Sequence, residues 1–167
     1  YPIFKKHSIP FTIFISSAFP ERQAIPWWYL LDEVLEKNDV IEFILEGKRH
    51  EFSCPDMATK DRAFSLIKNI IIRVPKDDLC KTLSNIFEPY GTDLPKKTQE
   101  LTLNWPQIEA ISSDSLVTIG AHTVHHFKLN ELNESQARDE IAESKRLLEL
   151  KIGKAVEYFA YPFGTSQ

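Results

Sequence analysis

The chain is poor in cysteine: it has only Cys54 and Cys80, and these do not form a C-x-x-C pair. Small disulfide-dependent domains carry four or more cysteines, and zinc ribbons and redox motifs need closely paired ones. The sequence therefore excludes a disulfide framework, a zinc ribbon and a thioredoxin-like redox site. A single bridge is still compatible with the sequence, so cysteine content leaves the compartment undecided.

Long apolar runs and blocks of like charge are also missing. The apolar stretch Ile9–Phe19 is interrupted by Pro10, Ser16 and Ser17, and it falls short of the roughly 20 residues that cross a bilayer. We therefore expect no membrane span in this segment. Twenty basic residues face 24 acidic ones, for a net charge of −4, and no block of five or six like charges occurs. A nucleic-acid partner is not expected, and neutral or small substrates fit better.

The composition is that of a globular domain. With 167 residues, of which 43% are hydrophobic and 26% charged, the chain can organise one ordinary core, whereas disorder and collagen-like repeats are excluded. The chain begins within what resembles the end of a packed element and stops just after a turn at Gly164. We therefore expect an excerpt of a longer protein, so any signal peptide would lie outside it.

The pattern of apolar residues predicts a parallel sheet. Phe11–Ile15 and Leu116–Ile119 are short apolar, β-branched runs typical of buried strands, and 155–161 is predicted as a third strand. Between the last two, Asn133 and Gln136 form a possible capping box for a helix through Leu150. Strand, helix and strand at this spacing form a βαβ unit. The helix is expected to pack on the outside of the sheet.

The middle of the chain is predicted to be mainly helical. Predicted are a helix over 26–37, a hairpin of 41–45 and 49–52 turning at Gly47, helices over 63–74 and 79–87, a linker over 89–97 and a helix over 105–111. One face of the second helix should be buried as a unit. Its members are Ala63, Leu66, Ile67, Ile70, Ile71 and Val74.

Three of the five histidines follow the strand 116–119. His122 and His126 lie four residues apart beyond a strand end, where α/β folds place their sites, so the two imidazoles could converge on one cation. A hydrogen-bonded turn with solvent-facing imidazoles is the alternative. A zincin-type metalloprotease is excluded because Thr123 stands where its base glutamate would follow the first histidine. His125 is either a supporting residue or a surface residue.

The flanking sequence resembles a known family. The run 118–126 resembles the H-[ST]-x-x-H metal motif of polysaccharide deacetylases, the carbohydrate esterases with a NodB homology domain. The run 159–164, Phe-Ala-Tyr-Pro-Phe-Gly, looks like the later strand-end motif that ends in P-[YF]-G, and residues 1–16 look like the segment after the first motif. The resemblance is weak over about 24–101, which looks like a helical insertion.

The resemblance implies a fold and a set of functional residues. The fold would be α/β, a distorted (β/α) barrel of the deacetylase type, with residues 1–167 forming part of one such domain. His122 and His126 would bind a divalent metal ion, Zn²⁺ above all, together with an aspartate. Phe163 would be catalytic through its backbone N–H, which points at the oxyanion of the tetrahedral intermediate. Tyr161 and Pro162 would contact the substrate.

Some family features are not found in the sequence. The first motif, with the base aspartate and the metal-binding aspartate, would lie before Tyr1, and the general-acid histidine would follow Gln167. In addition, Ala160 stands where many members have an arginine that orients the base. His125 and Phe127 replace the threonine and proline often found at their positions. These departures concern the details of the mechanism more than metal binding.

The resemblance implies a metal-dependent hydrolase that removes N-acetyl or O-acetyl groups from a polysaccharide, an oligosaccharide or a glycan precursor. An N-acetylated carbohydrate would then be the main partner. The alternative is a non-catalytic deacetylase-like barrel that binds carbohydrate or a protein. Oligomeric state and location are left open: the bacterial cytoplasm, the periplasm and the cell surface are all compatible with the sequence.

Overall fold

The structure is a computed structural model and describes residues 1–164. The chain divides into two compact units, each described here by itself. The first, which we call the sheet unit, comprises residues 1–24 and 102–164, and the second, the helical unit, comprises residues 25–101. The bounds of the helical unit lie within one residue of the stretch expected as an insertion. That it is inserted into one deacetylase domain stays a prediction.

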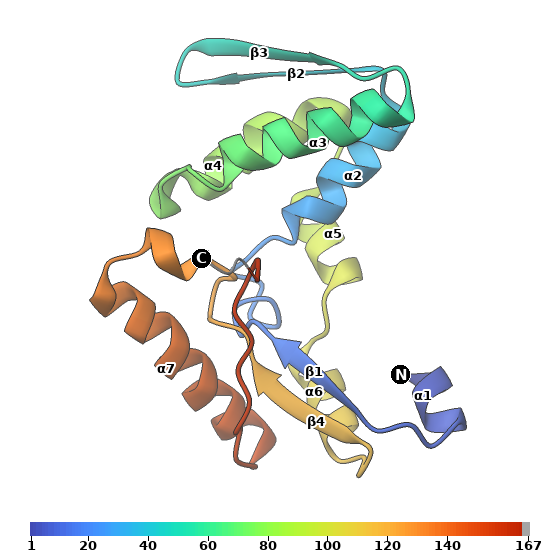
Figure 1. Cartoon of the computed structure of the whole chain (residues 1–167), viewed down its shortest axis with the longest axis vertical. Coiled ribbons are helices and arrows are strands. Elements are labelled where there is room, and N and C mark those ends of the chain that lie inside the picture. Colours follow the sequence, from blue (N-terminus) through green and yellow to red (C-terminus); the bar gives the residue numbers. More distant parts are fainter. Residues whose placement is uncertain (165–167) are drawn as a thin grey trace. The chain divides into compact units, whose positions relative to one another are not determined.

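The sheet unit is built around two parallel strands. Its elements are α1 (Pro2–Lys6), β1 (Phe11–Ile15), α6 (Trp105–Ser112), β4 (Val117–Ala121), the 3₁₀ turn η2 (Leu129–Glu131) and α7 (Glu134–Ile152). β1 and β4 pair in register from Phe11 opposite Val117 to Ile15 opposite Ala121, and Figure 1 shows them as neighbouring arrows of the same direction. The predicted parallel pairing of these two segments is confirmed.

β4 continues two residues beyond its predicted end. Gly120, which directly follows the predicted strand 116–119, lies inside β4 and is buried. A side chain at this position would bring its Cβ to 2.5 Å from the ring of Phe14 and 3.2 Å from the carbonyl oxygen of Tyr158. Glycine is therefore required for space on the sheet rather than for a turn.

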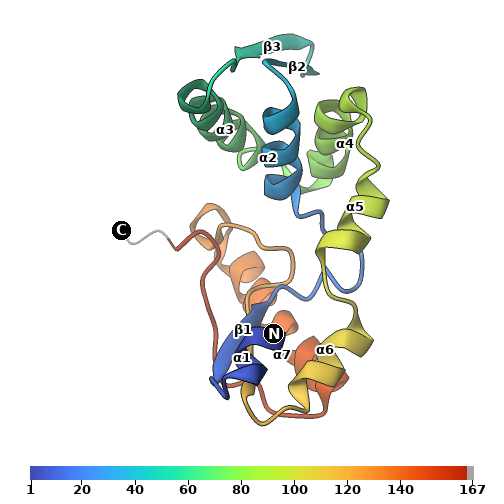
Figure 2. The same cartoon turned by 90° about the vertical axis from the view of Figure 1, so that its right-hand side faces the viewer.

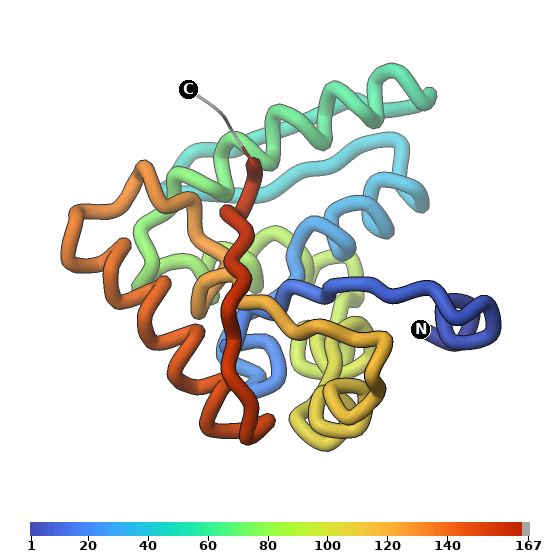
Figure 3. The backbone as a smooth tube through the Cα atoms, turned by 60° about the horizontal axis from the view of Figure 1, so that its bottom comes forward, coloured from blue at the N-terminus to red at the C-terminus, as the bar shows by residue number. Residues whose placement is uncertain are grey.

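The predicted third strand over 155–161 is wrong for most of its length. Only Phe159 of this segment pairs with the sheet, in a single parallel bridge to Ala121, and Figure 3 shows the segment passing one end of β4. The start of the segment is held by α7 instead: the Val156 N–H donates to Glu149 and the Lys145 ammonium donates to the Val156 carbonyl. Since the Val156 N–H already donates to a helix side chain, it cannot also donate within a ladder. Within residues 1–164 the strands do not close into a barrel.

The core of the sheet unit lies where α6 and α7 pack on β4. α7 is capped as the sequence predicts: the Asn133 side chain accepts from the Gln136 N–H at 2.9 Å, and the Gln136 side chain caps in return. The helix ends before Gly153, at φ +66°. The buried core residues are Ile15, Ile108, Ile119, Ala121, Leu148 and Val156.

The helical unit has one hairpin and four α-helices. Its elements are α2 (Trp27–Lys37), β2 (Val40–Leu45), β3 (Lys48–Ser53), α3 (Met57–Ile71), α4 (Lys76–Phe87), the 3₁₀ turn η1 (Glu88–Tyr90) and α5 (Leu94–Leu101). Figure 2 shows α2 between α3 and α4. The predicted hairpin is confirmed: β2 and β3 are antiparallel and turn at Glu46 and Gly47, both with positive φ.

Two predictions for this unit are wrong. The expected linker 89–97 contains η1 and the start of α5, because Asp93 caps the Lys96 N–H and Leu94 is buried. In α3, the buried face consists of Ala63, Ile67 and Ile71, whereas Leu66 is 45% exposed. Those three residues are four positions apart, so they form one row along the helix, and this row packs against the neighbouring elements.

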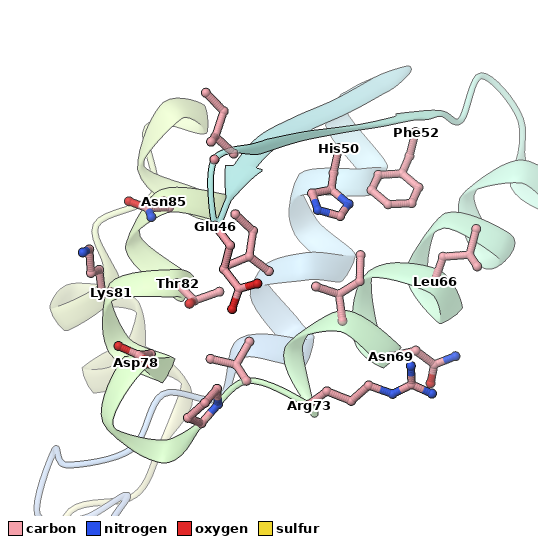
Figure 4. Close-up of a pocket in the computed structure, with 16 residues that line it drawn as sticks. Glu46, His50, Phe52, Leu66, Asn69, Arg73, Asp78, Lys81, Thr82 and Asn85 are labelled. Carbon is pink, nitrogen blue, oxygen red and sulfur yellow. The ribbon is translucent and has the colours of Figure 1, made fainter.

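The outward apolar residues of α3 line a groove instead. It has a volume of about 950 Å³ and lies between the β2–β3 turn, α3 and α4 (Figure 4). Leu66, Ile70 and Val74 form part of its wall. Its lining includes two acidic residues, Glu46 and Asp78, and two basic ones, Arg73 and Lys81. In the described residues, no helix is both long and apolar enough to cross a membrane, and Cys54 and Cys80 are not bonded to each other.

Candidate active site

The candidate site lies beyond the carboxyl ends of β1 and β4. Residues 122–126, here called the histidine loop, follow β4, and residues 16–18 follow β1. Four hydrogen bonds join the histidine loop to residues 15–18. They run from His122 N–H to the Ile15 carbonyl (3.1 Å), from Ser17 N–H to the Thr123 carbonyl (3.2 Å), from Ala18 N–H to the Val124 carbonyl (2.9 Å) and from the Ser16 hydroxyl to the His122 carbonyl (2.6 Å). The histidine loop is therefore fixed by the parallel pairing of segments about a hundred residues apart.

The structure brings His122 and His126 together. Their ring centroids lie 4.8 Å apart, with the ring planes at 72°. The two residues are not on a helix, and the loop between them folds back through left-handed backbone at Thr123 (φ 65°) and His126 (φ 62°). Such backbone is costly for residues with a Cβ, and it persists where surrounding contacts impose it. Here the buried Thr123 hydroxyl accepts the His126 N–H at 3.0 Å.

His122 is oriented by the backbone of the next chain segment. Its Nδ1 lies 2.8 Å from the carbonyl oxygen of Ala160. A carbonyl only accepts, so Nδ1 carries the proton in this contact and Nε2 is the nitrogen whose lone pair is available for a cation. A histidine ligand typically has its second nitrogen held in this way. The sequence does not reveal this partner, because Ala160 contributes its backbone and is 38 residues away.

His126 is half-buried in an aromatic surrounding. The ring of Phe163 packs edge-on against it at 5.1 Å between centroids, and Phe19 lies at 6.3 Å. Burial, and to a smaller extent the neighbouring His122, lowers the pKa of His126 to about 4. At neutral pH the imidazole is therefore uncharged, which is the form that binds a metal ion.

The turn predicted to carry the oxyanion donor lies next to this pair. Phe163 and Gly164 both have positive φ, 65° and 53°, so the chain turns sharply here. Pro162 is buried, whereas Tyr161 is 68% exposed and packs edge-on against Phe159. The Phe163 ring therefore packs against His126, and the exposed Tyr161 and the buried Pro162 directly precede it in the chain.

His125, the odd histidine of the loop, contacts a different residue. Its Nδ1 lies 2.7 Å from Oε1 of Glu140 on α7. Oε2 of Glu140 accepts the N–H groups of Val124, at 3.0 Å, and of His125, at 2.9 Å. Glu140 is only 5% exposed. Sequence reasoning missed it, although one signal was there: Glu140, Ser144 and Leu148 share one i, i+4 row, and a carboxylate on the row of a buried leucine is unusual.

Comparison with known proteins agrees with this geometry. Residues 88–167 match the family model described as polysaccharide deacetylase, and this stretch includes β4, the histidine loop, α7 and the Phe163 turn. The match covers slightly less than half of the chain, and this part is similar to polysaccharide deacetylases. The resemblance inferred from the motifs is confirmed. No curated protein and no solved structure matches the chain.

The deacetylase family generally uses a divalent metal ion, and the chemistry of the histidine pair can be compared with what such an ion needs. The imidazoles of His122 and His126 converge, and Nδ1 of His122 is held by the Ala160 carbonyl. Two nitrogen ligands suit Zn²⁺, which usually takes three protein ligands in catalytic sites. Within residues 1–164, no third His, Cys, Asp or Glu joins the pair to make a group that could hold a metal ion. The donor chemistry thus fits such an ion, while the ligand set of this segment is incomplete.

Proposed function

We propose that this chain forms part of the active site of a metal-dependent deacetylase. The enzyme would hydrolyse N-acetyl or O-acetyl groups on a polysaccharide, an oligosaccharide or a glycan precursor. One observation carries the proposal: His122 and His126 meet beyond the carboxyl end of β4, directly against Phe163, within the stretch that matches the deacetylase family. The family match supports deacetylation, whereas the metal and the substrate are parts of the proposal.

In this proposal His122, through Nε2, and His126 hold a divalent cation, with Zn²⁺ as the first candidate. When bound, such an ion would polarise a carbonyl and lower the pKa of a water molecule to about 7, and amide hydrolysis needs both effects. The residues of the chain prepare the site for it. Ala160 fixes the ring of His122, and burial keeps His126 uncharged down to a pH of about 4.

The turn at Phe163 would act on the substrate. Its backbone N–H is proposed to donate to the oxygen of the scissile carbonyl as negative charge develops there, which is the most effective place for a fixed donor. Tyr161 and Pro162 are proposed to contact the sugar, the exposed Tyr161 with its ring face. The proposal requires a base, a general acid and at least one carboxylate ligand from residues other than 1–164.

The deciding experiment uses the complete protein that contains this chain. Metal is removed by chelation and then restored, and acetate release is measured on a panel of N-acetylated and O-acetylated oligosaccharides. We expect activity to disappear and return with the metal. His122→Ala and His126→Ala should each abolish most turnover, whereas His7→Ala, which alters an exposed histidine at the end of α1, should leave turnover unchanged.

The opposite result favours the second function. If the complete protein takes up no metal ion and releases no acetate, the enzymatic proposal is wrong. A non-catalytic deacetylase-like protein that binds carbohydrate or a protein partner then takes its place, and binding to the same oligosaccharides tests it.

A further inference from the structure

We propose that Glu140 is the positioning residue that holds the two metal-binding histidines in place. It does so by binding the backbone between them, and the inference rests on the metal site of the proposed function. Glu140 is not a catalytic residue in this proposal, because its carboxylate contacts the histidine loop rather than the cation.

The contacts of Glu140 fall on the two residues in the centre of the loop. Oε2 accepts the N–H groups of Val124 and His125, and Oε1 accepts from Nδ1 of His125. Successive N–H groups that converge on one oxygen form an anion-binding nest, and the left-handed backbone of Thr123 just before them produces this convergence. Both carboxylate oxygens of Glu140 therefore accept hydrogen bonds from Val124 and His125.

The burial of Glu140 makes its carboxylate dependent on the hydrogen bonds from the histidine loop. A carboxylate that is 5% exposed is costly to bury unless hydrogen bonds compensate its charge. Three charge-assisted hydrogen bonds do so here, and all three come from the histidine loop. Any movement of the loop away from α7 would leave a buried carboxylate without these donors, so the loop is restrained to one position.

The loop is thus held from two sides. The segment after β1 binds its carbonyl groups, through Ser16, Ser17 and Ala18. Glu140 binds its N–H groups from α7. His122 precedes Val124 and His125, the two residues bound by Glu140, and His126 follows them. His122 adjoins the left-handed Thr123, and His126 is itself left-handed. Fixing the central pair therefore fixes the direction in which both flanking imidazoles leave the loop.

Contact with Glu140 also determines the tautomer of His125. A carboxylate accepts, so Nδ1 of His125 carries a proton whether the ring is neutral or charged. The neutral ring would then be the Nδ1–H form, which is the less common tautomer in water. Nitrogen-15 NMR of labelled histidine distinguishes the two tautomers and needs no metal ion.

The test compares three variants of the complete protein. Glu140→Gln keeps the size of the side chain but removes its charge and one acceptor, Glu140→Ala removes all three contacts, and Glu143→Gln is the matched control on an exposed face of the same helix. The measurements are the histidine NMR spectrum without metal and the affinity for Zn²⁺ by competition with a chelator.

We expect Glu140→Gln to convert neutral His125 to the Nε2–H tautomer and to shift the ring signals of His122 and His126. The Zn²⁺ affinity should fall by about 10-fold to 100-fold, the usual effect of losing a group that supports a metal ligand. The Zn²⁺ affinity of Glu140→Ala should fall at least as far. Glu143→Gln should match the unmodified protein in every measurement.

The inference is overturned if Glu140→Gln leaves the ring signals of His122 and His126 and the Zn²⁺ affinity unchanged. Glu140 then only anchors α7, whatever happens to the free energy of unfolding. A different result overturns the proposed function alone: the unmodified protein binds no Zn²⁺, yet Glu140→Gln still shifts the two ring signals. Because Glu140→Gln is nearly isosteric, the test does not depend on whether Glu140→Ala folds.

Discussion

The two units of the chain are built by different kinds of contact. In the helical unit, elements next to each other in sequence pair with each other: β2 turns directly into β3, and α3 and α4 follow with short connections. In the sheet unit, β1 pairs with β4 across about a hundred intervening residues, and the carboxylate of Glu140 reaches back to the loop after β4. The candidate site lies in the unit that depends on distant contacts.

Backbone strain is distributed in the same way. Of the five left-handed residues with side chains in the sheet unit, Thr123, His126 and Phe163 lie at the candidate site. The other two are Ser8 and Arg22. In the helical unit the comparable positions are Glu46, in a hairpin turn that calls for this conformation, and glycines. Distant contacts can impose conformations that local preferences disfavour, and such conformations aim side chains at a common point. This explains why the chemistry gathers in the sheet unit.

The largest expected effect tests the packing of the helical unit. Ile67→Ala should lower the free energy of unfolding by about 2 to 5 kcal/mol, because Ile67 is 0% exposed and its removal leaves a cavity. Leu66 is the neighbouring residue on the groove side and is 45% exposed. Leu66→Ala should therefore change the free energy of unfolding by less than about 1 kcal/mol. Urea denaturation measures both. Equal losses would show that the groove is closed in solution.

The next largest effect on stability compares a glycine needed for space with a glycine needed for its backbone conformation. Gly120→Ala in the sheet unit should cost about 1 to 3 kcal/mol, because its Cβ would overlap the Phe14 ring. Gly47→Ala in the hairpin should cost about 1 kcal/mol, through backbone conformation alone. Replacement of Gly47 by asparagine should therefore be nearly neutral.

A double variant identifies the cause at Gly120. Adding Phe14→Leu should recover part of the loss in Gly120→Ala, which thermal unfolding of the single and double variants will show. If the two changes are additive, the close approach to the Phe14 ring is not the cause, and the contrast between the glycines fails.

A smaller effect concerns acid stability of the sheet unit. The Tyr1 hydroxyl, the Leu116 N–H and the Lys5 ammonium donate to Asp114 and lower the pKa of its carboxyl to about 2. A carboxyl with a lowered pKa binds fewer protons when folded, so its contribution to stability is complete above pH 3.8, the ordinary value, and is lost as pH falls through about 2.

We expect Asp114→Asn to be less stable than the unmodified chain at neutral pH and to approach it as pH falls toward 2. Carboxyl carbon-13 NMR gives the pKa of Asp114 directly, and denaturation at several pH values gives the difference in stability. A titration midpoint near 3.8 would contradict the contacts of Asp114. The same comparison with Asp56→Asn examines the helical unit, where the Thr59 N–H lowers the pKa of Asp56.

The smallest effect is expected at His125. His125→Ala removes the contact to Oε1 of Glu140 but keeps the two backbone N–H contacts to Oε2. Turnover and Zn²⁺ affinity of the complete protein should therefore fall by less than in Glu140→Ala, and by far less than in His122→Ala. Equal loss in His125→Ala and His122→Ala would show that His125 belongs to the metal site itself.

The sequence by itself determined the local elements and the family. The Asn133 capping box, the turn at Gly47 and the strand segments 11–15 and 117–119 were predicted correctly. They depend on residues within a few positions of each other, and local patterns record such preferences. The histidine motif and the Pro162–Gly164 turn identified the deacetylase family for the same reason: their spacing is written along the chain.

Tertiary structure alone decided which groups meet. Leu66 and Ile67 are both apolar helix residues, and only the packing of α3 buries one and exposes the other. Phe159 alone joins the sheet, because the backbone of Val156 bonds to side chains of α7. The Ala160 carbonyl orients His122, and Glu140 clamps the histidine loop, through contacts 38 and 15 or 16 residues apart in the chain. Backbone groups look alike in every sequence, so their partners are set by the folded arrangement and not by residue type.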